Sequence, residues 1–312
     1  MSFLGLDVGG TKCRFEWWPR GCAAGGDAPT AQPAVHGVGA AVDGLEAAVR
    51  AATAAHEQPE AVVCAVAGGG DPALAQQMSA TLGERLGLPI AVVGDVVAAA
   101  AAGLREGPGL ALWSGTGSFA VARGPGGELV RVGGRGFAFG DEGSGYDLVR
   151  RAIIGALRAI DGRGRATALT EMLTAAFDAP SPERLGVVAQ RLSPGEVAGR
   201  LPVVLDAFEQ DDWLAADVLM VGMRQLVELG EAALRRAGMN AEAGLRVALG
   251  GGVLQSDTLR EGLVRVMQAA FGHEVDAHLV AAGDAALGAA WLAAGWQARE
   301  QPQQRWVDDV AL

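Results

Sequence analysis

Short apolar runs separated by Gly-rich turns recur along this chain. Residues 4–8 form one such run, which ends in a Gly-Gly-Thr turn and is followed by a second run at residues 13–17. Residues 110–114 repeat the design, with a Gly-Thr-Gly turn before the run at residues 119–122. An apolar strand, a tight turn with glycine and another strand predict a β-hairpin at both places.

Helices and buried strands are predicted to alternate after the first hairpin. Residues 21–39 are rich in Gly, Pro and Ala and predict a loop with at most one short strand. Apolar residues then recur at helical spacing over residues 42–52, and Asp71-Pro72 has the composition of another helix start. Residues 61–66 and 90–93 are continuous apolar runs, which are typical of buried strands.

A second series with the same order begins at the second hairpin. Three short strands are predicted within residues 110–132, followed by a helix at residues 146–160. Residues 161–240 show only helical patterns and have the character of an insertion, after which a buried strand is predicted at 245–249 and a strand and helix at 275–294. One α/β unit therefore occurs twice, which predicts mixed sheets flanked by helices and a ligand cleft between the copies.

The two hairpin turns have the composition of anion-binding loops. Glycines allow successive N–H groups to converge on one anion, and Thr and Ser hydroxyls add donors. The first strand ends in Asp7, whereas the second ends in the neutral Ser114. Since a carboxylate can hold a metal ion, this difference suggests a nucleotide bound with Mg²⁺. For either turn alone, an ordinary hairpin is the simpler interpretation.

Two common nucleotide-binding motifs do not account for these turns. Lys12 is the only lysine in the chain and lies between Thr11 and Cys13, so the Gly-Lys-Ser/Thr sequence of a P-loop is absent. Residues 115–120 fit the pattern G-x-G-x-x-A, but they continue as a strand where a dinucleotide-binding motif requires a helix.

Composition narrows the class of protein. The chain has 312 residues, half of them hydrophobic, which suits two folded lobes. The net charge of −11 argues against nucleic acid or an anionic membrane as a partner. Its three cysteines indicate neither a disulfide framework nor a zinc site. No secretory signal or membrane span is expected, and a cytoplasmic location is predicted.

Several motifs together resemble a known superfamily. Asp7-x-Gly9-Gly10-Thr11, the Ser114–Ser118 motif and a late strand ending in a glycine run are similar to those of the actin-like ATPase and sugar kinase superfamily. Gly133-Gly134-x-Gly136 with the Gly140–Ser144 motif resembles the N-acetylglucosamine kinase family, of the BadF/BadG/BcrA/BcrD ATPase type. This family is related to the ATPase activators of acyl-CoA dehydratases.

The resemblance covers nearly the whole chain and implies its fold. We expect an α/β protein made of duplicated ribonuclease H-like (actin-like ATPase) domains. Residues 1–105 would form the first lobe, completed by a C-terminal helix at about 283–312, and residues 106–282 the second, with the helical insertion at about 161–240.

The resemblance also assigns roles to individual residues. Asp95 is expected to be the general base, because sugar kinases of this superfamily carry one at this strand end, although Asp is also a good helix cap. Asp7 would hold Mg²⁺ through water. The sugar would contact Asp95, Gly134, Arg135, Asp141 and Gly69. The predicted ATP-binding residues are Gly9, Gly10, Thr11, Lys12, Ser114, Gly115, Thr116, Gly117, Ser118, Gly250, Gly251 and Gly252.

The implied activity is transfer of the γ-phosphate of ATP to a hydroxyl of N-acetylglucosamine, with the 6-hydroxyl expected. Two departures from the family bear on the sugar: Arg135 stands where the family usually has Trp, and residues 35–40 replace a loop that contains Asn. Glucosamine or another hexosamine therefore stays an alternative. The family further implies a homodimer.

Two alternatives belong to other functional classes. One is an activator ATPase of an acyl-CoA dehydratase, whose iron–sulfur cluster is held by cysteines of the second lobe, and this chain has no cysteine after Cys64. The other is a sugar sensor without catalysis, although no DNA-binding domain is apparent and both Asp7 and Asp95 are present.

Overall fold

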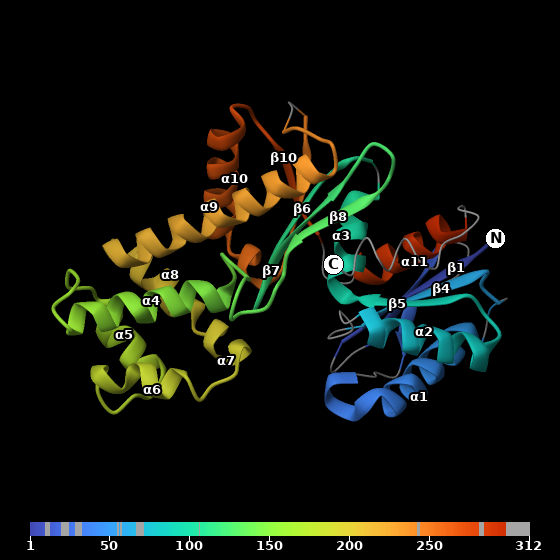
Figure 1. Cartoon of the computed structure of the whole chain (residues 1–312), viewed down its shortest axis with the longest axis horizontal. Helices are drawn as coiled ribbons and strands as arrows, with labels where there is room; N and C mark the ends of the chain where they lie inside the picture. Colours follow the sequence, from blue (N-terminus) through green and yellow to red (C-terminus); the bar gives the residue numbers. More distant parts are fainter. Residues whose placement is uncertain are drawn as a thin grey trace. The chain divides into compact units, whose positions relative to one another are not determined.

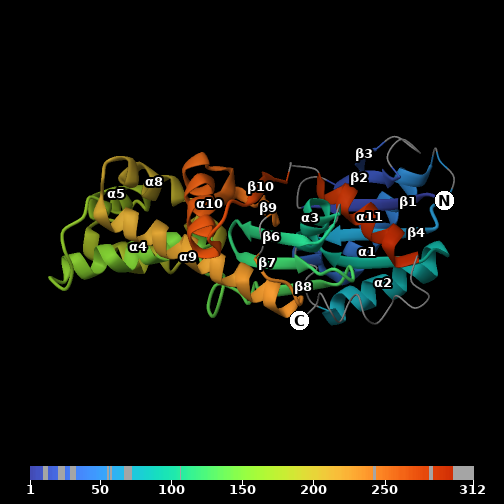
Figure 2. The same cartoon turned by 90° about the horizontal axis from the view of Figure 1, so that it is seen from above.

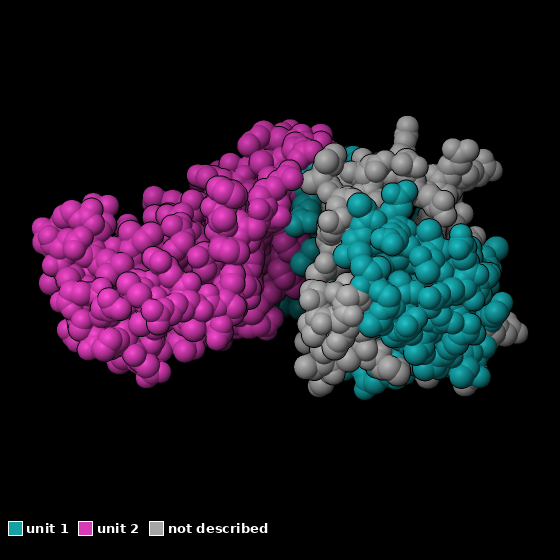
Figure 3. Space-filling model, turned by 60° about the horizontal axis from the view of Figure 1, so that its bottom comes forward, with its two compact units in different colours: residues 1–109, 123–131, 279–312 teal, residues 110–122, 132–278 magenta. Residues whose placement is uncertain are grey.

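The computed structural model describes residues 1–9, 13–19, 25–28, 33–54, 56, 58–66, 72–105, 107–241, 244–280 and 284–297. The chain divides into two compact units, coloured separately in Figure 3. Unit 1 comprises residues 1–109, 123–131 and those from 279 onward, and unit 2 comprises residues 110–122 and 132–278. None of the described helices combines the length and the apolar character that crossing a membrane requires.

The sheet of unit 1 contains five strands in the order β3-β2-β1-β4-β5. β1 pairs antiparallel with β2 and parallel with β4, and β4 pairs parallel with β5. The predicted first hairpin is thus present. The strands are β1 (Phe3–Val8), β2 (Cys13–Trp18), β3 (Gly26–Ala28), β4 (Ala61–Val66) and β5 (Ile90–Gly94).

The second sheet repeats the order of the first. Its neighbours run β10-β9-β6-β7-β8, so that hairpin strands β6 and β7 take the places of β1 and β2, and β9 takes the place of β4. β6 is parallel to β9, as β1 is to β4. The predicted duplication into two mixed sheets is confirmed. The strands are β6 (Gly109–Ser114), β7 (Ser118–Arg123), β8 (Leu129–Gly133), β9 (Arg246–Gly250) and β10 (Asp276–Leu279).

Helices cover both faces of the first sheet, as Figures 1 and 2 show. α1 (Pro33–Thr53) and α2 (Pro72–Leu86) lie on one face, where Leu4, Leu6 and Val8 of β1 are fully buried. α3 (Asp95–Leu104) and α11 (Asp284–Gln297) cover the other face. Gly5 of β1 permits this packing, because a Cβ there would collide with the backbone of Ala290 in α11.

The prediction of a loop over residues 21–39 is wrong for its C-terminal part, which belongs to helix α1. The Gly/Pro/Ala composition of residues 21–39 predicted a loop with at most one short strand, but only β3 and the start of α1 are described there, and α1 begins at Pro33. Residues 35–40 are therefore helical, not a sugar-binding loop of the family type. The reason is tertiary: Val38 packs on the core that holds Val42 and Leu45, and this burial outweighs the helix-weakening glycines nearby.

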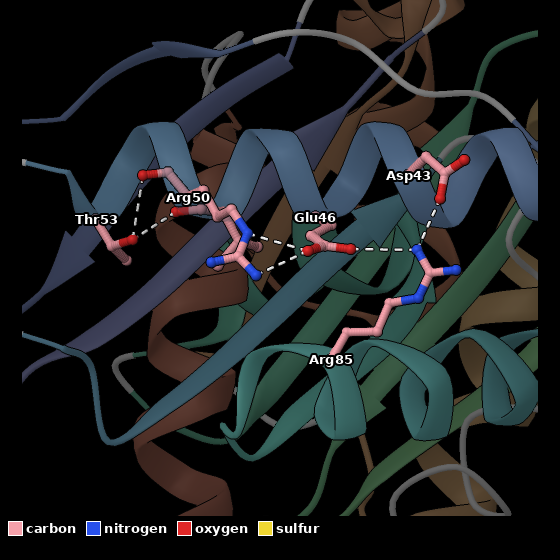
Figure 4. A network of polar contacts seen from close by, with 6 residues as sticks. Asp43, Glu46, Arg50, Thr53 and Arg85 are labelled. Atoms are coloured by element: carbon pink, nitrogen blue, oxygen red, sulfur yellow. Dashed lines mark hydrogen bonds and ion pairs between the residues drawn. The ribbon is translucent and has the colours of Figure 1, made fainter.

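Charged residues join α1 to α2 on the surface (Figure 4). Arg85 of α2 donates to Asp43 at 2.7 Å and to Glu46 at 3.2 Å, and Arg50 donates to the other oxygen of Glu46 at 2.8 Å. These side chains are largely solvent-exposed, so water and salt screen each pair and its contribution to stability is small. They link the two helices at the surface of unit 1.

The helical region predicted at 161–240 is present in unit 2. These helices share one hydrophobic core with the helix before them. The core contains Leu148, Leu169, Val204 and Val218. The described helices of unit 2 are α4 (Gly145–Ile160), α5 (Leu169–Ala176), η1 (Pro182–Arg184), α6 (Leu185–Ala189), α7 (Pro194–Ala198), α8 (Leu201–Glu209), α9 (Trp213–Arg236), η2 (Gly252–Gln255) and α10 (Asp257–Phe271).

Candidate active site

Asp7 and Asp95 lie near the carboxyl ends of two parallel strands of unit 1, β1 and β5, which are separated in the sheet by β4. Asp7 of β1 is level with Ala65 of β4, which is level with Val93 of β5. Asp95 follows Val93 by two residues and is the first residue of α3. Because side chains alternate along a strand, Asp7 points to the same face as Gly5, the face that α11 covers. The carboxyl end of a parallel sheet is where open α/β sheets bind ligands.

Burial changes the acidity of both groups. It raises the pKa of the Asp7 carboxyl, and the negative charge of Asp95 raises it further, while Arg14 lowers it. Burial also raises the pKa of Asp95, against the lowering effect of backbone N–H groups and the charge of Arg131. The effect of Asp95 on Asp7 places the predicted base and the predicted metal-binding carboxylate within electrostatic reach of each other. An Asp with a raised pKa is a stronger proton acceptor than a free one.

The backbone holds the Asp95 side chain in one orientation. Its Oδ1 accepts a hydrogen bond from the N–H of Val96 at 2.9 Å. Gly94 occupies the N-cap position of α3, and Asp95 is the first helical residue, in the turn where the helix dipole favours a negative charge. The helix-start interpretation and the functional one are therefore compatible, since a carboxylate has about four acceptor positions and backbone N–H groups use only part of them.

The turn between β6 and β7 is tied to the loop that precedes α4, both in unit 2. The Ser114 hydroxyl donates to the carbonyl of Gly143 at 2.8 Å, and the Ser118 hydroxyl donates to the carbonyl of Glu142 at 2.6 Å. Both serines are buried. We expected both hydroxyls to donate hydrogen bonds to ATP. Their protons are instead used in hydrogen bonds to the loop.

Thr116, at the tip of this turn, is different. Its side chain is exposed, and neither its hydroxyl nor its N–H bonds to any described residue. Two backbone hydrogen bonds stabilise the turn instead. The N–H of Gly115 donates to the carbonyl of Gly117, and the N–H of Gly145 donates to the carbonyl of Gly115, each at 2.8 Å. A rigid turn with free donors at its tip is suited to bind phosphate oxygens.

The glycine run after β9 packs directly on this turn. Gly251 has φ +91°, and a Cβ on it would collide with the carbonyl of Ser114. A Cβ on Gly250 would collide with the Trp113 ring. Gly252 faces open space. The structure therefore brings together two segments that are far apart in sequence and that we predicted to bind ATP.

Asp141 lies against the same turn. Its side chain is only 9% exposed, its Oδ1 accepts from the N–H of Ser118 at 3.4 Å, and its backbone has the left-handed φ of 59°. A non-glycine residue with positive φ is strained and is found more often at functional sites than elsewhere. The predicted contact of Asp141 with sugar hydroxyls stays a prediction.

The loop between β8 and α4 exposes Arg135 and two aromatic side chains. Phe139 is 92% exposed, and Phe137, 49% exposed, makes an edge contact with Tyr146 at a centroid distance of 5.1 Å. Gly134 lies in the same loop, and a Cβ on Gly140 would touch the Cβ of Arg135. Phe137 and Phe139 were not identified from the sequence, where they are indistinguishable from core residues.

Some predicted residues lie outside the described part of the chain. These are Gly10, Thr11, Lys12 and Gly69, whereas Gly9, which follows β1, is described. Of the cysteines, Cys13 and Cys64 are described as free and buried. Burial raises the pKa of the Cys13 thiol to about 12 and that of Cys64 as well, so neither is a nucleophile near neutral pH.

Sequence reasoning missed two charged residues that support the site. Asp147 accepts from the N–H of Gly143 at 3.1 Å, and its N–H donates to the Ser144 hydroxyl, which caps α4. A capping signal, Ser144 followed three residues later by an acid, was present in the sequence. Arg131, whose charge acts on Asp95, carried no such signal, because it is 36 positions away and only folding brings it near.

The chain was compared with protein families and curated proteins. The model of the BadF/BadG/BcrA/BcrD ATPase family matches residues 4–293. An N-acetylmuramic acid/N-acetylglucosamine kinase of Clostridium acetobutylicum is 34% identical over 139 residues, which are 44% of this chain and 45% of that protein. The match thus spans less than half the length of this curated relative.

Solved structures show the same fold. A candidate N-acetylglucosamine kinase from Chromobacterium violaceum superposes with a TM-score of 0.65 and 25% identity, covering 93% of this chain and 98% of that one. A ROK hexokinase from Thermus thermophilus superposes with a TM-score of 0.57 and 22% identity, covering 96% and 100%. The second likeness concerns the fold alone.

Proposed function

The chain belongs to the BadF/BadG/BcrA/BcrD ATPase family, and from that premise we propose that it is a kinase that phosphorylates an amino sugar with ATP. The relatives named above as N-acetylglucosamine kinases support the acceptor class. The acidic residues to which the proposal gives a role lie in unit 1, and the turn proposed to bind the nucleotide lies in unit 2.

The observation that carries the proposal is the environment of Asp95. Its carboxylate is held by Val96, and burial raises its pKa. The acceptor hydroxyl gives its proton to Asp95 while its oxygen bonds to the γ-phosphorus, the bond from that phosphorus to the bridging oxygen breaks, and ADP leaves. Proton removal by a positioned base is the part of phosphoryl transfer that a protein side chain performs.

Asp7 fits a role in holding Mg²⁺. Its half-buried carboxylate feels the negative charge of Asp95, and a divalent cation would relieve the repulsion between them. Mg²⁺ takes oxygen ligands, keeps several waters and needs only one or two carboxylates. When bound it would neutralise charge on the phosphates of ATP.

The nucleotide would be held by the β6–β7 turn and the adjacent glycine run. The Thr116 hydroxyl and N–H are free to donate to phosphate oxygens. Gly252 leaves open space beside Gly115, where a nucleoside could approach the backbone. The serines on either side fix the turn and would not donate their hydroxyls to ATP.

Arg135 bears on which amino sugar is accepted. Its side chain is exposed in the predicted sugar loop and forms no ion pair with any described residue. A free guanidinium recognises a carboxylate through two parallel hydrogen bonds. We therefore expect N-acetylmuramic acid, which carries a carboxylate, to be used at least as well as N-acetylglucosamine.

The test is a comparison of acceptors with ATP and Mg²⁺. Values of kcat/KM are measured for N-acetylmuramic acid, N-acetylglucosamine, glucosamine and glucose, with the wild type and Arg135→Trp. The variant should lose about tenfold or more on N-acetylmuramic acid, and its preference for N-acetylglucosamine should sharpen. If no amino sugar is phosphorylated, or if ATP is hydrolysed rapidly without any sugar, the kinase assignment is wrong.

A further inference from the structure

A basic hollow of about 550 Å³ lies in the helical part of unit 2, apart from the segments described above as the nucleotide site. It lies between α4 and α9, which run alongside each other in Figures 1 and 2. Four arginines and one acid, Asp217, line it. In a chain with a net charge of −11, such a concentration of positive charge is unexpected on composition alone. The arginines are Arg150, Arg151, Arg158 and Arg163.

The four arginines are only partly neutralised by their neighbours. Arg150 and Arg151 share one carboxylate, that of Asp147, at 3.0 and 2.8 Å. Arg163 pairs with Asp161 at 2.7 Å. The guanidinium of Arg158 forms no ion pair or hydrogen bond with any described residue. The hollow thus retains positive charge that a bound anion could neutralise.

Part of the wall of the hollow is apolar, and hydrogen bonds hold this part in place. Ile154, Trp213 and Val218 line it together with the arginine stems. The Trp213 ring is fixed by a hydrogen bond from its Nε1 to the carbonyl of Ala166 at 2.8 Å. Asp212, which is buried, caps α9 and also accepts from the Thr167 hydroxyl and the N–H of Ala168, so that the helix end beside the hollow is anchored. A preorganised wall of this kind suits the face of a ring.

We propose that this hollow binds a phosphate monoester of a ring-containing metabolite, at a site separate from that of the kinase reaction. Guanidinium groups match the geometry of a phosphate through paired hydrogen bonds, and the apolar wall accepts the ring. The volume admits a body of hexose phosphate size. The overall negative charge of the protein disfavours a nucleic acid as the source of the phosphate.

The probe for this site is glucose 6-phosphate, titrated calorimetrically into the full chain without ATP. Glucose and inorganic phosphate are titrated separately, to resolve the contributions of the ring and the anion. The variant Arg158→Ala/Arg163→Ala removes the unpaired arginine and the one paired only with Asp161. The matched control is Arg235→Ala, an exposed arginine of α9 outside the hollow that pairs with Glu231.

The double variant should bind glucose 6-phosphate at least about tenfold more weakly, while Arg235→Ala binds as the wild type does. Arg158→Lys/Arg163→Lys should restore part of the affinity, which a general loss of folding would not allow. Inorganic phosphate should bind more weakly than the ester, and glucose not at all. Equal affinity in the wild type and the double variant, or no binding of the ester to the wild type, would overturn the proposal.

Discussion

The Asp95 carboxylate must be ionised to accept a proton, and burial opposes ionisation. Its pKa is raised above the ordinary value of 3.8, so it stays protonated to a higher pH than a free aspartate. Activity should therefore fall as the pH drops toward this raised pKa. The acid limb of kcat/KM, measured at saturating ATP, should lie above the ordinary aspartate value of 3.8 and be lost from the residual activity of Asp95→Asn. A limb at the ordinary aspartate value would contradict the burial argument.

Thr116 is the side chain on which the nucleotide turn depends most directly. Thr116→Val replaces the free hydroxyl by a methyl group of similar shape, so the affinity for ATP should fall about tenfold while the affinity for the sugar is kept. Thr116→Ser retains the hydroxyl and is the control. Calorimetric titration of ATP into the three proteins decides the matter: unchanged affinity in the valine variant would mean that the phosphates bind elsewhere.

At the scale of single residues, the sequence indicates which side chains could act on a ligand better than it indicates their hydrogen-bond partners. Asp7 could be proposed because an acid at the carboxyl end of an apolar strand is conspicuous, whereas the choice of Asp95 depended on the family resemblance, since an Asp at a helix start is also a common cap. The engagement of the Ser118 hydroxyl could not be foreseen, because its acceptor, the carbonyl of Glu142, lies 24 positions away. A hydroxyl in a Gly-rich turn looks the same in sequence whether it serves a ligand or a neighbouring loop.

The elements around the nucleotide turn make a prediction about adjacent glycines. Gly251→Ala places a Cβ against the Ser114 carbonyl at a positive φ, so it should lower the free energy of unfolding by about 2 kcal/mol or more. Gly252→Ala meets open space and should leave stability unchanged, yet weaken ATP if the nucleoside lies there. Thermal melts and ATP titrations of both variants separate the two effects. Equal melting temperatures would show that the close packing is not needed.

Elements were predicted well where periodicity is strong and poorly where composition misleads. The strands β4 and β5 are continuous apolar runs, and the structure has them at Ala61–Val66 and Ile90–Gly94. The start of α1 was misjudged, because glycines and a proline suggested a loop. Proline in the first helical turn and the burial of Val38 on the sheet made the segment helical instead.

At the scale of the whole molecule, the duplication of the α/β unit is clearer in the strand order of the two sheets than in the amino-acid sequence. Only the hairpin motifs of residues 4–17 and 110–122 are visibly similar, yet the two sheets have the same order when β6 is matched to β1. Side chains between these motifs have diverged, because many apolar residues fill a core equally well. The domain boundaries at 105 and 282 stay a prediction, since the compact units defined by contacts also assign residues 123–131 to unit 1.

The most direct test of the account is the rate of sugar phosphate formation by Asp95→Asn, followed by mass spectrometry with ATP, Mg²⁺ and the best acceptor. The substitution keeps the side-chain volume and can keep the hydrogen bond from Val96, but it removes proton acceptance. Because it also removes a half-buried charge whose pKa is raised, the melting temperature at neutral pH should be equal to or higher than that of the wild type. The account predicts a loss of kcat of about 10²-fold or more with ATP affinity retained. Turnover near the wild-type rate in a folded variant would contradict it.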